Sequence, residues 1–338
     1  MSFELAAEIQ KRYGNVRRAR GCYLYTEKGV RLTDCYLDGG RALLGWDGGK
    51  ARTVFKDTLE RGATGAYCGG YESRLATAVR HLLPREYTEI RWYYGDCASG
   101  SANSATCAVS GGSVLCGSAD GASAGTALGA RGSTTGTHEA CVRDAVLWRP
   151  WLDICAESTP KPTRYPEITI IHPGAERPAI IRLVPPYPWA TTLCIYAFRT
   201  DAPQTVASGA KTEQGATAAT GANAAQLAST PQTTNIPPSD VVPAPLLAAY
   251  ARAFCDLKTA LGTFGENDFK CFAKQLSPLF DRRACWLFPK IPRADYDTFA
   301  LRCLDAGIVV SPDYDTPSII PWRANKGDIK RIAECYKQ

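Results

Sequence analysis

Cysteine and histidine are the side chains whose types would most readily do chemistry in this sequence. The chain contains 14 cysteines and 3 histidines, but no two cysteines form a Cys-x-x-Cys pair. Metal sites need ligands at short, fixed spacings, and only His138 and Cys141 come near one. Two small side chains on one helical face explain this pair without a metal. The sequence therefore predicts no metal site.

The histidines also lack the partners that nucleophilic catalysis requires. His81, His138 and His172 have no serine or cysteine at a motif spacing. His172 lies before Pro173 and Gly174, and this arrangement predicts a structural turn. No Gly-x-x-x-x-Gly-Lys-Ser/Thr sequence is present, which argues against a P-loop nucleotide site. Any catalytic group must be sought elsewhere in the chain.

Charge and hydropathy argue against two classes of partner. The net charge of +6 is small for 338 residues. Its one basic cluster, Arg17-Arg18-Ala-Arg20, predicts a solvated helix end or loop and not a nucleic-acid surface. No run of about 18 apolar residues is present to span a membrane. The first residues also lack a secretory signal pattern, so we expect a soluble, cytoplasmic protein with reduced thiols.

The first 95 residues predict a regular start to the fold. Leu5, Ile9 and Tyr13 repeat at four-residue spacing and so share one helical face. Runs at 21–26 and 30–37 flank Gly29, which supplies the positive φ of a hairpin turn. The further helices and the strand expected in this part lie at 54–62, 75–84 and 88–95.

Two low-complexity segments interrupt this regular pattern. Residues 97–137 are mostly Ala, Gly, Ser and Thr, and residues 201–238 are rich in Ala, Gln and Thr. Short β-like runs lie between them, and they predict a sheet with both faces covered. These runs are 167–171, 178–184 and 192–198.

The last third of the chain alternates helices and strands again. Leu247, Ala251, Phe254, Leu257 and Leu261 form a helical stripe that stops at a glycine. The other helices expected here cover 269–276, 296–307 and 329–336. The expected strands cover 285–288 and 308–310. This alternation predicts an α/β fold.

The sequences at the two ends carry a resemblance to a known family. Gly21-Cys-Tyr-Leu-Tyr-Thr-Glu-Lys-Gly-Val-Arg-Leu-Thr-Asp, followed by Gly39-Gly40 and Leu43-Leu-Gly-Trp, resembles the opening of class III aminotransferases. At the other end, Pro245-Leu-Leu-Ala-Ala-Tyr and Leu304-Asp-Ala-Gly-Ile-Val-Val-Ser-Pro resemble the family's late elements. The likeness covers roughly 15–95 and 243–336.

The resemblance implies a cut-down fold-type-I pyridoxal-phosphate transferase fold, with a mixed-sheet large domain. A small α/β domain would come from both chain ends. The N-terminal part of the small domain would cover 1–49 and the C-terminal part 243–338. The reduced large domain would cover 50–242, with low-complexity inserts at 97–137 and 201–238. Members of the family dimerise, so the resemblance also implies a homodimer.

The chemistry of this family needs a phosphate seat, a lysine and a carboxylate around pyridoxal phosphate. By resemblance, Ser99-Gly100-Ser101 would bind the phosphate at a helix N-terminus. The family has an acidic residue after this motif, whereas this chain has Ala102 and Asn103. A serine-rich linker with a chance match therefore remains an alternative.

Lys211 is the candidate for the lysine that forms a Schiff base with the cofactor. It is the only lysine between Lys161 and Lys258, and it lies roughly where the resemblance places this residue. Its neighbours carry no packing signal, although such a lysine needs a desolvated, rigid seat. A solvated linker lysine is therefore the alternative.

The carboxylate is the clearest departure from the family pattern. The family places an acidic pair on a strand well before the lysine, but nothing between Ile180 and Thr200 is acidic. Asp201 is too close to Lys211, and Asp153 and Glu157 match no strand. We therefore expect an aminotransferase-like binding protein with lost or reduced activity. The alternative is an active pyridoxal-phosphate enzyme acting on an amino acid or related amine.

We expect limited proteolysis to cut first within 97–137 and 201–238. Small side chains bury little apolar area, at about 25 cal/mol per Å², against an ordering cost of about 1–2 kcal/mol per residue. Peptide mapping over time measures this. Protection of both segments equal to that of 245–261 would contradict the expectation.

Overall fold

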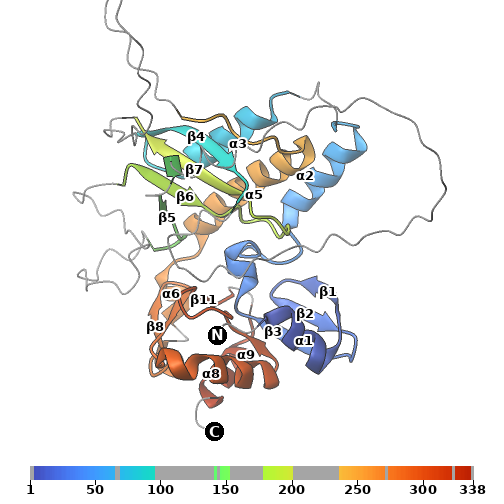
Figure 1. Cartoon of the computed structure of the whole chain (residues 1–338), viewed down its shortest axis with the longest axis vertical. Helices are drawn as coiled ribbons and strands as arrows, with labels where there is room; N and C mark the ends of the chain where they lie inside the picture. Colours follow the sequence, from blue (N-terminus) through green and yellow to red (C-terminus); the bar gives the residue numbers. More distant parts are fainter. Residues whose placement is uncertain are drawn as a thin grey trace, which may run out of the picture. The chain divides into compact units, whose positions relative to one another are not determined.

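Figure 1 shows the computed structural model of the chain, which describes eight ranges of residues. The ranges are 4–64, 69–95, 141–142, 145–152, 178–200, 236–270, 273–321 and 324–335. The segment 97–137, residues 201–235 and the predicted strand at 167–171 lie outside them. No helix in these ranges is long and apolar enough to cross a membrane.

The first sheet joins the two ends of the chain. Its strands are β1 (Val16–Arg20), β2 (Tyr23–Thr26), β3 (Arg31–Asp34) and β10 (Ile308–Val309), in the order β1-β2-β3-β10. The predicted hairpin is β2–β3, and β10 pairs with β3 in parallel, with Ile308 opposite Thr33. The Tyr13 hydroxyl in addition donates to the Leu304 carbonyl at 2.8 Å. The expectation that the two ends pack together is confirmed.

The arginine cluster near the N-terminus forms an edge strand, so the predicted helix end or loop was wrong. Val16–Arg20 is β1, which pairs antiparallel with β2. Four of its five residues are exposed. Exposed charge on an edge strand discourages pairing with further chains, and this explains why a strand can be so basic.

The second sheet has the order β4-β7-β6-β5. Its strands are β4 (Tyr87–Tyr93), β5 (Val146–Leu147), β6 (Ile180–Leu183) and β7 (Cys194–Arg199). Strand β7 is antiparallel to both β4 and β6, whereas β5 and β6 are parallel. It follows that β4, β5 and β6 run in the same direction and end at the same edge of the sheet.

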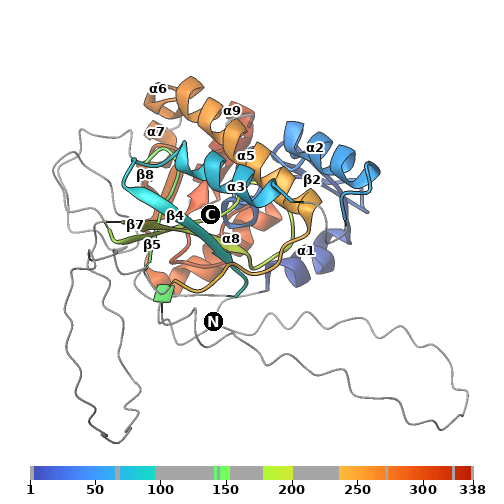
Figure 2. The same ribbon diagram turned by 90° about the horizontal axis from the view of Figure 1, so that it is seen from above.

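Three helices pack together beside this sheet: α2 (Gly49–Glu60), α3 (Tyr71–Arg80) and α5 (Ala244–Thr263). Helix α5 lies against both α2 and α3, and α3 packs against β4 (Figure 2). Ten residues of α5 are buried, including Tyr250 and Phe254. The helical stripe predicted over 247–261 is therefore the central contact face of this layer.

The remaining elements come mostly from the last third of the chain. The third sheet has the order β11-β9-β8. Its strands are β8 (Phe280–Arg283), β9 (Trp286–Pro289) and β11 (Ser318–Ile319). The remaining helices are α1 (Leu5–Tyr13), α6 (Glu266–Lys270), α7 (Ala273–Leu276), α8 (Arg293–Asp305) and α9 (Lys326–Glu334). One hydrophobic cluster includes residues of all three sheets.

A buried carboxylate holds the loop between β3 and α2. Asp34 is 2% exposed, and its Oδ1 accepts from the backbone N–H groups of Tyr36 (2.9 Å) and Leu37 (2.8 Å). Its Oδ2 accepts from the indole N–H of Trp46 at 2.7 Å. Leu37 and Asp38 have φ of 50° and 51°, a left-handed conformation that costs free energy for residues other than glycine. The Asp34 bonds offset part of that cost.

Trp46→Phe tests the Asp34 anchor, because it removes one donor to a buried carboxylate and keeps an aromatic ring. We expect the free energy of unfolding near pH 7 to fall by about 1.5–3 kcal/mol. Trp189→Phe is the matched control, since Trp189 is 41% exposed. Chemical denaturation of both variants measures the difference.

The same variant should show a defined pH dependence. Burial raises the pKa of Asp34 from 3.8 to about 6. Ionised Asp34 is thus disfavoured in the fold, and its contribution to stability falls as the pH rises from 3.8 to about 6. The Trp46 N–H favours the charged form of Asp34. The loss of unfolding free energy in Trp46→Phe should therefore be smaller at about pH 5 than at about pH 7. An equal loss of unfolding free energy at about pH 7 and about pH 5 would contradict the role of the Trp46 N–H as a donor to ionised Asp34.

Candidate functional site

A small cavity lies where β5 and β6 end. In open α/β sheets, ligands bind beyond the carboxyl ends of the strands, so this edge is the first place to look for a site. We call this space the sheet-edge cavity. Its lining comes from the loop after β3, from the residues at the ends of β5 and β6, and from β9. The lining residues are Gly39, Gly40, Leu43, Leu147, Trp148, Arg149, Pro150, Val184, Pro186 and Trp286.

Aromatic and backbone contacts fill most of the sheet-edge cavity. The indole of Trp286 donates to the Pro150 carbonyl at 2.7 Å. The guanidinium of Arg149, a residue that is 7% exposed, lies 5.1 Å from the Trp286 ring centre. A Cβ added at Gly40, whose φ is 101°, would stand 3.5 Å from the Trp286 ring. The remaining volume is about 20 Å³, which is room for about one water molecule.

The described lining of this cavity does not fit pyridoxal phosphate. The cofactor needs a lysine for covalent attachment and a charged partner for its ring nitrogen. Within the described lining there is no lysine and no carboxylate, and Arg149 is its charged group. The volume of about 20 Å³ is far below the 300 Å³ or more of ordinary small-molecule sites. No step of catalysis can be built from these residues.

The predicted site residues Ser99, Gly100, Ser101 and Lys211 lie outside the described residues. So do Asp153 and Glu157. Their places therefore stay predictions, but the strands that precede them can be compared. Strand β4, which leads toward Ser99, ends at the edge that carries the cavity, because it runs in the direction of β5 and β6. Strand β7, which leads toward Lys211, ends at the opposite edge, where Arg199 faces Tyr87.

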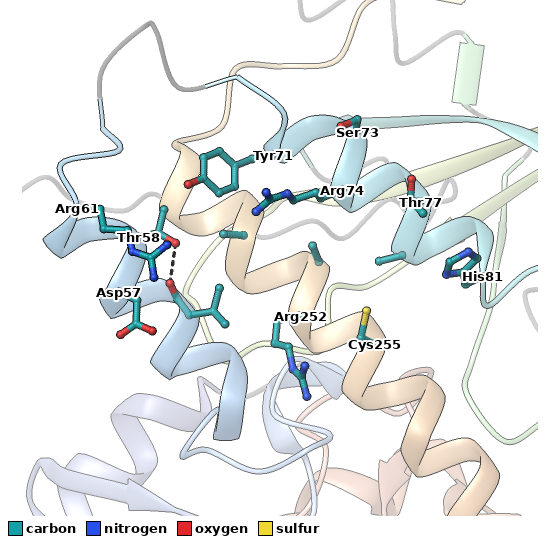
Figure 3. Close-up of a pocket in the computed structure, with 14 residues that line it drawn as sticks. Asp57, Thr58, Arg61, Tyr71, Ser73, Arg74, Thr77, His81, Arg252 and Cys255 are labelled. Carbon is teal, nitrogen blue, oxygen red and sulfur yellow. Dashed lines mark hydrogen bonds between the residues drawn. The ribbon is translucent and has the colours of Figure 1, made fainter.

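A much larger cavity lies among the three helices α2, α3 and α5 (Figure 3). Its volume is about 530 Å³. We call it the three-helix groove. Helix α2 and its end contribute Val54, Asp57, Thr58 and Arg61. Helix α3 and its end contribute Tyr71, Ser73, Arg74, Thr77, Ala78 and His81, and α5 contributes Ala248, Ala251, Arg252 and Cys255.

The groove combines an apolar floor with cationic walls. Ala78, Ala248 and Ala251 are buried along its base. Arg61 and Arg74 reach from α2 and α3 toward the space between the helices (Figure 3). In the described part of the chain neither of them makes an ion pair, and Arg74 lies 5.4 Å from the Tyr71 ring centre. The arrangement suits an anion that carries an apolar body.

Arg252 differs from the other two arginines because a carboxylate already holds it. Its guanidinium donates to Asp256, one turn further along α5, at 2.7 Å. In Figure 3 it points along α5, away from Arg74. Asp57, on α2, is the acidic residue of the lining. The positive character of the groove therefore comes mainly from Arg61 and Arg74.

Sequence analysis missed this groove, although one signal pointed toward it. The lining residues repeat at the spacing 0, 3, 4, 7 on each helix, for example at 54, 57, 58 and 61, and at 248, 251, 252 and 255. This spacing places residues on one helical face. The spacing could have identified three helical faces that each combine polar and apolar residues. It does not say which of these faces meet. Among the described residues no group of three or more His, Cys, Asp or Glu side chains could hold a metal.

Comparison with known sequences gives short matches. No family model matches the chain. An uncharacterized protein of Treponema pallidum is 48% identical over 87 residues, which is 26% of this chain and 28% of that protein. One of Borreliella burgdorferi is 36% identical over 64 residues, which is 19% of this chain and 24% of that protein. The matched region thus spans only about a quarter of either relative.

Comparison with solved structures covers almost the whole chain. An (S)-enantioselective omega-transaminase from Thermomicrobium roseum has a TM-score of 0.54, with 9% identity over 100% of this chain and 94% of that chain. Ornithine delta-aminotransferase from Plasmodium falciparum has a TM-score of 0.51, with 9% identity over 95% and 91%. Acetylornithine aminotransferase from Elizabethkingia anophelis has a TM-score of 0.50, with 10% identity over 97% and 96%. The chain therefore has the α/β fold of fold-type-I pyridoxal-phosphate-dependent aminotransferases.

Proposed function

We propose that this protein is an aminotransferase-like binding protein with negligible transaminase activity. On this proposal pyridoxal phosphate binds weakly at best. The observation that carries the proposal is the sheet-edge cavity, which has a volume of about 20 Å³. It lies where a fold of this class receives its ligand, at the carboxyl ends of parallel strands.

The residues at the ends of β5 and β6 support the proposal chemically. Trp148, Arg149 and Pro150 follow β5, and Val184, Pro185 and Pro186 follow β6. None of these side chains can form a Schiff base or accept the proton of a pyridinium ring. Transamination depends on several groups that act together on one cofactor ring, so the loss of even one of them removes most of the rate.

The three-helix groove supports the binding part of the proposal. It has the volume of a small-molecule site, and it lies apart from the sheet-edge cavity because the two share no lining residue. Rigid helices hold its walls on three sides. The fold can thus bind a ligand even if the sheet edge no longer supports catalysis.

The competing hypothesis is an active enzyme that uses Lys211. Strand β4 leads toward Ser99 at the edge of the sheet that carries the cavity, and this direction is the observation in its favour. On that hypothesis Lys211 and Ser99–Ser101 would have to meet in one pocket of adequate volume. Activity and cofactor binding distinguish the two hypotheses.

We predict that purified protein with saturating pyridoxal phosphate transfers amino groups from amino acids to keto acids no faster than free cofactor does. The reason is that the described cavity holds neither a lysine nor a carboxylate. The absorbance spectrum with added cofactor should likewise match that of free cofactor. Lys211→Ala should leave both measurements unchanged.

Lys258→Ala serves as the matched control, since Lys258 is exposed on α5. Turnover that is clear in the native protein and in Lys258→Ala, but absent in Lys211→Ala, would overturn the proposal. Turnover that persists in Lys211→Ala but disappears in Lys258→Ala would overturn it as well, and would assign the chemistry to Lys258.

A further inference from the structure

We propose that the three-helix groove binds a small organic anion, a carboxylate or phosphate ester with an apolar body, between Arg61 and Arg74. The inference rests on the proposed binding role and names the class of ligand. The groove has a volume of about 530 Å³, within the range of about 300–1,000 Å³ typical of small-molecule sites. A ligand the size of one or two aromatic rings fits such a space.

The floor of the groove selects an apolar body. Val54, Ala78, Ala248 and Ala251 present methyl groups from all three helices. Their short side chains keep the space open, because a longer side chain at any of these positions would occupy it. Burial of apolar ligand surface against them contributes about 25 cal/mol per Å².

The walls of the groove select an anion. Arg61 follows the last turn of α2 and Arg74 lies in the first turns of α3, and both side chains are exposed. Neither has a carboxylate partner in the described ranges, so an incoming anion displaces no ion pair. A guanidinium offers paired N–H donors that match both oxygens of a carboxylate or phosphate.

The other polar groups of the lining refine this preference. The hydroxyl groups of Tyr71, Ser73 and Thr77 lie on α3, on the same side of the groove as Arg74 (Figure 3). The Ser73 hydroxyl already donates to the Gly70 carbonyl at 2.9 Å, so the hydroxyls of Tyr71 and Thr77 are the ones that can donate to a ligand without adding charge. Asp57 lies one turn before Arg61 on α2 and weakens the attraction of that wall for an anion, so the ligand charge belongs on the side of Arg61 that faces Arg74. A neutral ligand gains only the apolar contact.

Fluorescence titration with 8-anilinonaphthalene-1-sulfonate tests the proposal, because this probe joins an aromatic body to an anion. N-phenyl-1-naphthylamine has the same body without the charge and serves as the ligand control. We expect the native protein to bind the sulfonate at least about tenfold more tightly than the neutral compound. Equal affinity for the two compounds would overturn the proposal.

The variant Arg61→Ala/Arg74→Ala should remove that preference and leave binding of the neutral compound nearly unchanged. Lys50→Ala/Lys56→Ala is the matched control, since it removes the same charge from exposed positions of α2 outside the groove. Arg61→Lys/Arg74→Lys should retain part of the preference. The proposal would be overturned if the preference for the sulfonate survives in Arg61→Ala/Arg74→Ala. It would also be overturned if the preference falls equally in Lys50→Ala/Lys56→Ala.

Cys255 reports where the probe binds. This exposed free thiol lines the groove on α5. Iodoacetamide should alkylate Cys255 more slowly when the sulfonate is bound, with peptide mass spectrometry as the readout. Unchanged alkylation at saturating sulfonate would place the probe elsewhere and overturn the proposal, even if an arginine variant fails to fold.

Displacement of the sulfonate by phenylacetate and by phenyl phosphate then identifies the anionic group. Displacement by either compound supports the proposal and names the chemistry, and displacement by neither overturns it. The outcome is independent of transaminase turnover. If turnover were observed but the arginine preference held, the proposed function would fail while the groove assignment stood.

Discussion

The bonds of one buried carboxylate shape the part of the molecule that faces the sheet edge. Asp34 ends β3, and three N–H groups converge on it, from Tyr36, Leu37 and Trp46. They hold the chain through left-handed conformations at Leu37 and Asp38, which no hydrophobic contact alone would specify. The loop then brings Gly40 against the Trp286 ring. Without this anchor the sheet-edge cavity would have no fixed wall on that side.

The parallel pairing of β3 with β10 connects that anchor to the last third of the chain. Ile308 and Val309 join the N-terminal hairpin, and the Cys35 backbone N–H donates to the Val309 carbonyl at 2.7 Å. The Ile319 N–H donates to the Cys35 carbonyl at 2.6 Å, which ties β11 to the same point. The chain ends therefore close one side of the cavity together. Because the sheet-edge cavity is almost completely filled, the functional proposal assigns ligand binding to the three-helix groove instead.

Local periodicity predicted the helices and most strands, because the contact faces of α1, α3 and α5 repeat in the sequence. It failed for Arg17–Arg20, where an edge strand carries charge on both faces and shows no alternation. The resemblance predicted that the two chain ends pack together, but the parallel pairing of β3 with β10 was not predicted. Nothing local specifies a partner 275 residues away, from Thr33 to Ile308. The three-helix groove depends on which helical faces meet, and single-helix patterns do not contain that information. Ser99–Ser101 and Lys211 remain predictions from resemblance.

Reduction with borohydride after incubation with pyridoxal phosphate tests the central claim most directly, because it fixes the cofactor to any lysine that holds it. Peptide mass spectrometry then locates and quantifies the modified lysines. The closed sheet edge predicts low, dispersed modification of exposed lysines such as Lys56 and Lys258, rising with cofactor concentration without saturation. Stoichiometric modification of one lysine at low cofactor concentration, at Lys211 or elsewhere, would contradict the account.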